Sequence, residues 1–217
     1  MSKHFEFTGE TCNRFGVTLH QIRATRDLPR HGVARGDVGG WIEKDDNLFG
    51  GAWVFGGAWV FGGAWVFGGA WVFGDAQVFG DAQVFGDAWV FGGAWVFGDA
   101  RVYGDAQVFG DAQVYGDAQV YGRAILTEGQ DILVVHPIGS ESVTATLART
   151  DDGHILSVGC WQNGTVDELA AEVERRSKHW WEASAFECDR WIAEYAALET
   201  LCRARISAWT AQKEVTR

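Results

Sequence analysis

The fold of this chain is decided by the stretch from Gly50 to Tyr121, which begins GGAWVFGGAWVF and ends GDAQVYGDAQVY. It repeats one six-residue unit, Gly-(Gly/Asp)-Ala-(Trp/Gln/Arg)-Val-(Phe/Tyr), twelve times without interruption. In an extended segment the Ala and Val side chains, two residues apart, point to one side, and the other two side chains point to the opposite side. The Ala and Val positions therefore predict an interior, and the aromatic positions predict an exterior.

The Gly-Gly or Gly-Asp pair that opens each hexad predicts a turn, because Gly adopts positive φ without steric cost and Asp tolerates turns. Strands that turn every six residues leave no room for hairpins, so the chain has to coil in one direction. Disordered, glycine-rich sequence is the alternative interpretation. The fixed register of Val and an aromatic residue in every hexad argues against it.

The hexads resemble those of the left-handed parallel β-helix superfamily, and the resemblance runs from Val38 to Leu126, including GGWIE at Gly39 to Glu43. It implies a triangular prism with three hexads per coil, in which residues eighteen apart stack. The expected fold is mainly β: a left-handed parallel β-helix (hexapeptide solenoid) with an N-terminal β cap and a C-terminal α+β module that ends in a long helix.

Three segments are expected. Residues 1–37 form an N-terminal β-hairpin cap, since Phe5–Phe7 and Val17–Ala24 have strand character and the open edge of a β-helix needs covering. Residues 38–126 form the β-helix, and residues 127–217 form the α+β module.

Three strands, two helices and a seven-residue apolar spacing are predicted for the C-terminal module. The strands are ILVVHPIG, SVTATLAR and HILSVGCW, after which Asn163-Gly164 is expected to break the sheet. A capping box at Thr165 opens the first helix, which runs to about Lys178. The second helix is expected from about Trp180 to Ala211, with apolar residues on one stripe.

The first hexads carry no charge between Gly50 and Phe73, whereas later corners carry Asp, starting at Asp75. Large apolar patches usually mark interfaces, so we expect this part of the repeat to be covered. Plain stacking within the solenoid is the alternative explanation for the Phe/Tyr position, and solvated turns are the alternative for the Asp residues. The predicted oligomer or partner surface consists of Trp53, Trp59, Trp65, Trp71, Phe55, Phe61, Phe67, Phe73, Trp181 and Trp191.

The resemblance raises the question of catalysis, because hexapeptide β-helices include CoA-dependent acyltransferases and gamma-class carbonic anhydrases. The former use a histidine base beside an inserted loop, and the latter use three histidines on zinc; the repeat holds neither histidine nor loop. His136 with Asp131, or Cys160 with His154, could be drawn as reactive pairs, but their spacing is uninformative. We therefore predict no catalytic residue, no metal site and no cofactor, and we lean against an enzyme.

The net charge of −11 disfavours direct binding of nucleic acid. No stretch reaches the ~18 apolar residues of a membrane span. The four cysteines are widely spaced, which indicates reduced thiols and a cytoplasmic protein.

Two further motifs, GDVGGWIE and GCWQNGTVDEL, are similar to hexapeptide-repeat proteins of bacteriophages and prophages. We expect a non-catalytic oligomeric scaffold or binding protein that is phage-encoded and lies in the bacterial cytoplasm. A homotrimer is favoured by analogy, with a host protein or small ligand as a further partner. Two alternatives stay open: a phage counter-defence protein that binds a nucleotide signal or host factor, and an acyltransferase-like enzyme.

Overall fold

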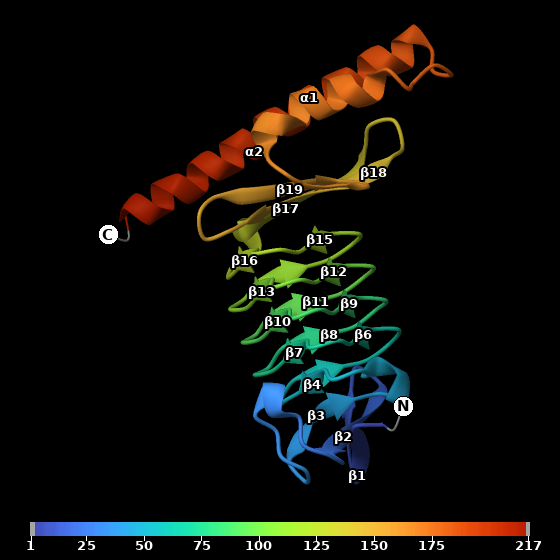
Figure 1. Ribbon diagram of the computed structural model, residues 1–217, viewed down its shortest axis with the longest axis vertical. Helices are drawn as coiled ribbons and strands as arrows, with labels where there is room; N and C mark the ends of the chain where they lie inside the picture. Colours follow the sequence, from blue (N-terminus) through green and yellow to red (C-terminus); the bar gives the residue numbers. More distant parts are fainter. Residues whose placement is uncertain (1–2, 216–217) are drawn as a thin grey trace. The chain divides into compact units, whose positions relative to one another are not determined.

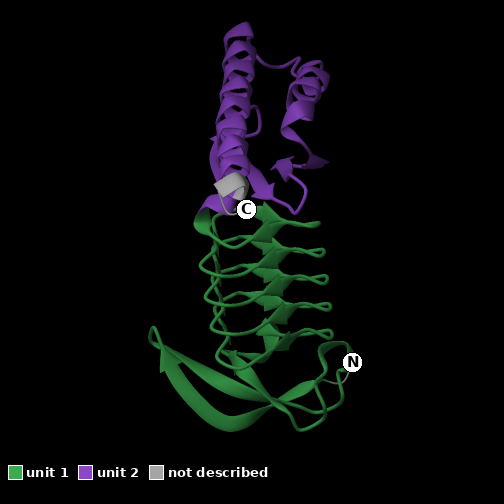
Figure 2. Ribbon diagram, turned by 90° about the vertical axis from the view of Figure 1, so that its left-hand side faces the viewer, with its two compact units in different colours: residues 1–129 green, residues 130–217 purple. Residues whose placement is uncertain are grey.

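The computed structural model describes residues 3–215. The chain divides into two compact units, Met1–Gly129 and Gln130–Arg217 (Figure 2). The first unit is a parallel β-solenoid of about five turns with an N-terminal β cap, and the second combines a small sheet with two helices (Figure 1). The predicted fold class, mainly β with a solenoid and a long final helix, is confirmed.

Each of the twelve hexads forms one two-residue strand, and Ile125–Leu126 adds a thirteenth after the last hexad. These strands are β4 (Trp53–Val54), β5 (Trp59–Val60), β6 (Trp65–Val66), β7 (Trp71–Val72), β8 (Gln77–Val78), β9 (Gln83–Val84), β10 (Trp89–Val90), β11 (Trp95–Val96), β12 (Arg101–Val102), β13 (Gln107–Val108), β14 (Gln113–Val114), β15 (Gln119–Val120) and β16 (Ile125–Leu126). Every third strand pairs in parallel, so Trp53 lies beside Trp71 and Trp71 beside Trp89. The predicted eighteen-residue stacking is therefore confirmed.

The interior holds only the residues predicted for it within the repeat. The Ala and Val side chains of all twelve hexads, from Ala52 to Val120, have an exposed fraction of 0%. The corners need glycine for two reasons, as Gly86 illustrates. Its φ is 71°, and a Cβ there would lie 2.9 Å from the backbone nitrogen of Gly104 in the next coil. Coils can therefore stack this closely only where the corner lacks a side chain.

The N-terminal cap extends one face of the solenoid. Strand β1 (Phe5–Arg14) pairs antiparallel with β2 (Val17–Ala24), which pairs antiparallel with β3 (Val38–Ile42). Strand β3 then runs parallel to β5 and so starts the ladder of that face. The predicted hairpin is confirmed. Two short 3₁₀ helices, η1 (Pro29–His31) and η2 (Asp45–Asn47), belong to the same region.

The second unit contains a four-stranded antiparallel sheet in chain order and two helices. Its elements are η3 (Gly129–Asp131), β17 (Ile132–Ile138), β18 (Val143–Arg149), β19 (His154–Val158), β20 (Trp161–Gly164), α1 (Val166–Ser177) and α2 (Ala185–Val215). Helices and sheet share one apolar core that includes Leu147, Leu156, Leu169, Leu198 and Cys202.

Two expectations for this unit are wrong. The sheet has four strands and not three, because the turn lies at Gly159, whose φ is 56°, and Asn163-Gly164 belongs to β20. The second helix begins at Ala185 and not near Trp180. Ser184 precedes it, and the Glu187 carboxylate accepts hydrogen bonds from the backbone N–H and hydroxyl of Ser184, which fixes the start there.

Candidate functional site

The first coil of the solenoid has a surplus of backbone carbonyl groups. Within the ladders each N–H donates to a carbonyl of the following coil, as Trp53 does to Ala70 at 3.1 Å and Phe55 to Val72 at 2.8 Å. Among the described residues, the carbonyls of Gly51 and Ala52 before β4 and of Ala64 before β6 accept no backbone N–H from a preceding coil, whereas Val66 in β6 accepts the N–H of Phe49 at 3.1 Å. Buried carbonyls without a donor are destabilising, so other groups have to supply the hydrogen bonds.

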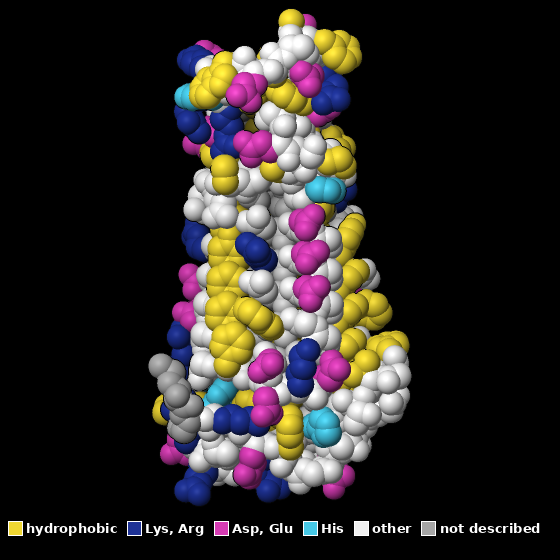
Figure 3. Space-filling model, turned by 90° about the vertical axis from the view of Figure 1, so that its right-hand side faces the viewer, with side chains coloured by type: hydrophobic (Ala, Val, Ile, Leu, Met, Phe, Trp, Pro, Cys, Tyr) yellow, Lys and Arg dark blue, Asp and Glu magenta, His cyan; other side chains and the backbone are white. Residues whose placement is uncertain are grey.

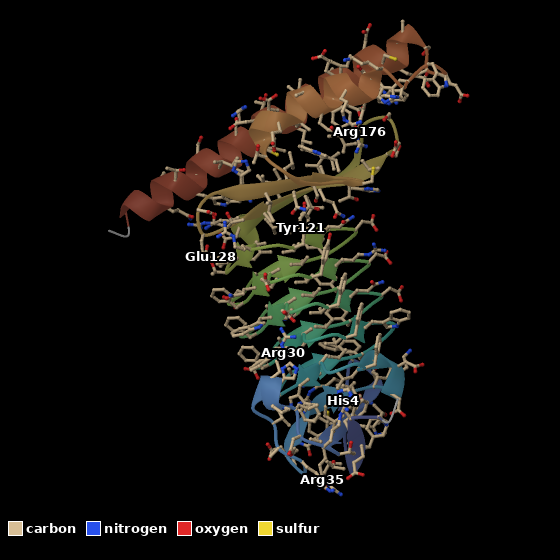
Figure 4. The ribbon with its side chains drawn as sticks, viewed as in Figure 1. His4, Arg30, Arg35, Tyr121, Glu128 and Arg176 are labelled. Atoms are coloured by element: carbon tan, nitrogen blue, oxygen red, sulfur yellow. The ribbon has the colours of Figure 1, made fainter. Side chains whose placement is uncertain are left out.

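Three basic side chains of the cap serve the edge at β4. His4 Nε2 donates to the carbonyl of Ala52 at 2.9 Å, and His31 Nε2 donates to that of Gly51 at 2.5 Å. Arg26 adds a long contact of 3.5 Å to the carbonyl of Gly50. A carbonyl can only accept, so Nε2 carries the proton in both imidazoles. Figure 4 labels His4 among the side chains of this region.

Asn47 serves the edge at β6 in the same way. Its fully buried side chain donates from Nδ2 to the carbonyls of Ala64 at 2.8 Å and Gly62 at 3.2 Å. Its Oδ1 accepts from the backbone N–H of Lys44 at 2.9 Å. One amide thus uses both of its ends, and together with the N–H of Phe49, which donates to the Val66 carbonyl at 3.1 Å, it closes the second open edge.

Both cap histidines are neutral bases under ordinary conditions. Burial is the main cause that lowers the pKa of His4 and of His31, and nearby arginines lower it further. The hydrogen bonds to Ala52 and Gly51 act in the opposite direction. The geometry therefore gives these histidines a structural role as donors to the open coil.

The cap also covers three of the predicted surface tryptophans, which corrects the expectation for Trp53. That side chain points out of the prism but is fully buried, with the His4 ring centroid 6.2 Å from its own. Trp71 is covered by His31, whose ring centroid lies 4.8 Å away, and Trp59 lies under the Arg14 guanidinium at 4.8 Å. The uncharged first coil is therefore covered to a large extent by its own chain.

Trp65 is the predicted surface tryptophan of the repeat that stays open. It lies on the third face, in β6, with an exposed fraction of 48%. The predicted Phe residues are half-buried, and most stack on the next coil, as Phe67 does on Phe85 at 4.8 Å and Phe73 on Phe91 at 4.6 Å. The stacking alternative therefore accounts for the Phe/Tyr position. Figure 3 shows such an aromatic column beside a column of acidic side chains.

The two predicted surface residues of the second unit differ from each other. Trp181 is 76% exposed and lies in the loop that joins α1 to α2. Trp191 is half-buried against Trp180, with ring centroids 5.2 Å apart. The sequence interpretation missed Phe186, which is also 76% exposed and lies in the first turn of α2. It also missed the exposed Trp89 and Trp95, which lie beyond the uncharged hexads.

Two hollows adjoin the solenoid. The larger, about 620 Å³, lies at the first coil and is lined by Lys3, His4, Arg26, Asp45, Leu48, Phe49 and Gly50. The smaller, about 300 Å³, is lined by Arg30, Gly69, Trp71, Asp87, Trp89, Asp105 and Gln107. Neither was predicted, because each combines residues from the repeat with residues of the cap whose return path the sequence pattern does not encode.

The residues of the reactive pairs considered from the sequence make other contacts. His154 Nε2 accepts the backbone N–H of Val166 at 3.0 Å, at the start of α1, and Cys160 Sγ accepts from Arg176 at 3.3 Å. Asp131 accepts from Arg149 at 2.8 Å, and His136 contacts Thr144 at 2.9 Å. Within residues 3–215, no three His, Cys, Asp or Glu side chains are placed to hold a metal ion.

No helix in the described part of the chain is both long and apolar enough to cross a membrane. No protein family model matches the chain, and a search of curated proteins finds no relative.

Proposed function

We propose that this protein is a non-catalytic scaffold or binding protein that assembles into a homo-oligomer through the open third face of its solenoid. The observation that supports the proposal is the exposed fraction of Trp65, which is 48%. The adjacent Gly62-Gly63 corner has no side chain of its own, and the Glu43 carboxylate accepts a hydrogen bond from the N–H of Gly62. We call Trp65, Phe67 and this corner the Trp65 surface. Against a neighbouring copy, such a surface would remove a large indole from water.

The energy available from this surface is modest but useful. About half of an indole, roughly 100 Å², remains to be buried on each protomer, which corresponds to about 2.5 kcal/mol. Association has to offset lost translational freedom, so contacts beyond Trp65 are needed for a stable complex. The exposed Trp181 and Phe186 of the second unit offer apolar area for such contacts.

The order and the origin of the assembly rest on the resemblance to hexapeptide-repeat proteins. We propose a trimer because related β-helices commonly form trimers. A phage-encoded protein in the bacterial cytoplasm follows from the similarity of the GDVGGWIE motif. The partner is a second copy of this chain, with a host protein as a further partner.

Light scattering coupled to size exclusion tests the assembly. We expect wild-type protein near three times the chain mass of 23.9 kDa, and Trp65→Gln near one chain mass. Gln is the residue that the repeat itself uses at this position, so the solenoid should stay folded. The matched control is Trp89→Gln, a partly exposed indole on another face, which should leave the mass unchanged. A monomeric wild type, or an unchanged mass for Trp65→Gln, would contradict the proposal.

A further inference from the structure

One aromatic ladder of the solenoid ends on an open ring. We call Phe49, Phe67, Phe85, Tyr103 and Tyr121 the Phe49 ladder; successive ring centroids lie 5.0, 4.8, 4.9 and 5.2 Å apart. Rings inside a ladder have both faces covered, so they expose only their edges. Phe49 is the first rung, and its exposed fraction is 40%.

The other face of Phe49 is not covered by a ring among the described residues. The two rings that contact Phe49 are both in the next coil: Phe67, stacked at 5°, and Trp65, edge-on at 76°. The neighbouring ladder, by contrast, is continued past its first rung Phe61 by Phe15, at 6.4 Å and 28°. The cap therefore supplies the next rung for one ladder and leaves that place open for the other.

The open place adjoins the hollow of about 620 Å³, which is large enough for a small-molecule ligand. Leu48 and Phe49 contribute apolar wall, and Lys3 and Arg26 contribute positive charge. Lys3 is paired with Asp45, which leaves Arg26 as the remaining cation of the lining; within residues 3–215 it makes one long contact, to the carbonyl of Gly50. His4 is neutral, so the lining carries a net charge of about +1 on a chain of −11.

We propose that this hollow binds a planar aromatic ring that carries one anionic group. The ring stacks on the open face of Phe49 as the missing first rung, and the anionic group pairs with the Arg26 guanidinium. Stacking on an aromatic side chain is tolerant of ring type, and the guanidinium fits phosphate and carboxylate alike. A nucleoside monophosphate and an aromatic carboxylate share this chemistry.

The smaller hollow does not fit such a ligand. Trp71 and Trp89 are stacked on each other at 5.2 Å and 15°, so the two ring faces that meet there are already covered. Its charged lining includes Asp87 and Asp105, and its Arg30 is already paired with Asp87. An aryl anion would meet carboxylates at this place, so the observations favour the hollow at Phe49.

Isothermal titration of the full chain with four probes tests the ring and the anion separately. AMP carries both, adenosine only the ring, inorganic phosphate only the anion, and benzoate a ring with a carboxylate. We expect a dissociation constant below about 1 mM for AMP or for benzoate, and at least about ten-fold weaker binding of adenosine and of phosphate. Whichever of AMP and benzoate binds more tightly identifies the source of the ligand.

Two variants place the binding at this hollow. Phe49→Leu keeps an apolar side chain but removes the stacking face, and we expect about ten-fold weaker binding. Arg26→Gln keeps an N–H donor for the Gly50 carbonyl but removes the charge, and we expect a similar loss together with a weaker dependence on salt. The controls are Phe85→Leu, inside the same ladder, and Arg30→Gln, a cap arginine that does not line this hollow.

Four results would overturn the proposal: no binding of AMP or benzoate up to about 5 mM, phosphate binding as tightly as AMP, adenosine binding as tightly as AMP, or wild-type affinity in both variants. The probe comparison uses the wild-type chain, so it decides the matter even if a variant unfolds. The proposal does not depend on the oligomeric state, because every lining residue comes from one chain. Loss of the Trp65 assembly would leave it intact.

Discussion

His4 Nε2 donates to the carbonyl oxygen of Ala52 at 2.9 Å, across 48 residues of sequence, and this bond closes an edge of the solenoid. An unclosed edge strand offers its carbonyls to any other chain that can extend the ladder. His31 repeats the arrangement at Gly51. The histidines nearest the repeat are therefore explained as structural donors.

Stability should depend on pH through these two histidines. Their pKa is near 6.5 when unfolded, and burial lowers it in the folded protein. Between those pKa values the unfolded state binds more protons, so the free energy of unfolding falls as the pH drops through 6.5. The decline from these groups ends below the folded pKa, and neither group contributes a slope well above 6.5.

Urea unfolding at several pH values checks this expectation. Replacing His4 and His31 by Gln keeps a donor at each site but removes the titration, so the double variant should lose less stability on acidification. His154 also has a pKa lowered by burial, in the second unit, and remains in both proteins as an internal reference. Identical pH dependence of wild type and double variant would rule out this role.

Asn47→Leu should be strongly destabilising, although the two side chains have similar volumes. It would leave the carbonyls of Gly62 and Ala64 and the N–H of Lys44 without their partner. A buried unsatisfied group costs about 1–3 kcal/mol, so we expect a loss of at least ~2 kcal/mol in chemical denaturation. The exposed Asn13→Leu is the control and should change stability little.

Adjacent substitutions in one strand test the inward and outward assignment. Val114→Asp places a carboxylate in the dry interior without a partner and should cost roughly 3–5 kcal/mol. Gln113→Asp, one residue earlier, lies on the exposed side and should change the unfolding free energy by less than about 0.5 kcal/mol. Equal midpoints in denaturant would show that the assignment is wrong.

Deletions test the coil of three hexads. Removing residues 80–97 takes out one whole coil, and each later hexad keeps its face, because coils contact only their neighbours. Removing residues 80–85 shifts every later hexad by one face, so Trp89 would leave the ladder of Trp71. We expect a higher melting temperature for the eighteen-residue deletion than for the six-residue one. Equal melting temperatures and equal mass for the two would argue against the coil.

Most of the solenoid could be predicted from the sequence because the residues of each hexad determine its local structure. Ala and Val fix the interior, the Gly pair fixes the corner, and the period fixes which residues stack. Helix α1 was likewise predicted, because Thr165 and Glu168 form the capping box that their spacing indicates. These are all local relationships, and local relationships are what a single sequence displays best.

The burial of Trp53 could not be predicted, because it depends on how the chain returns over the first coil. No periodic signal marks His4, His31 or Arg26 as donors, since each acts alone on one carbonyl. The start of α2 did have a signal that was overlooked: Ser184 and Glu187 have the spacing of a capping box. The apolar residues seven apart begin at Trp181, so the predicted helix was started too early, near Trp180.

Because the hexads are nearly identical, packing of the interior does not determine which coil stacks on which. A chain that slid by eighteen residues during folding would still place Ala on Ala and Val on Val throughout the core. Only unique contacts, such as Asn47 on Ala64 and His31 on Gly51, distinguish the first coil from the second. The contacts that close the edge therefore also define where the solenoid begins. The correct register of the coils depends on a few polar side chains and not on the core.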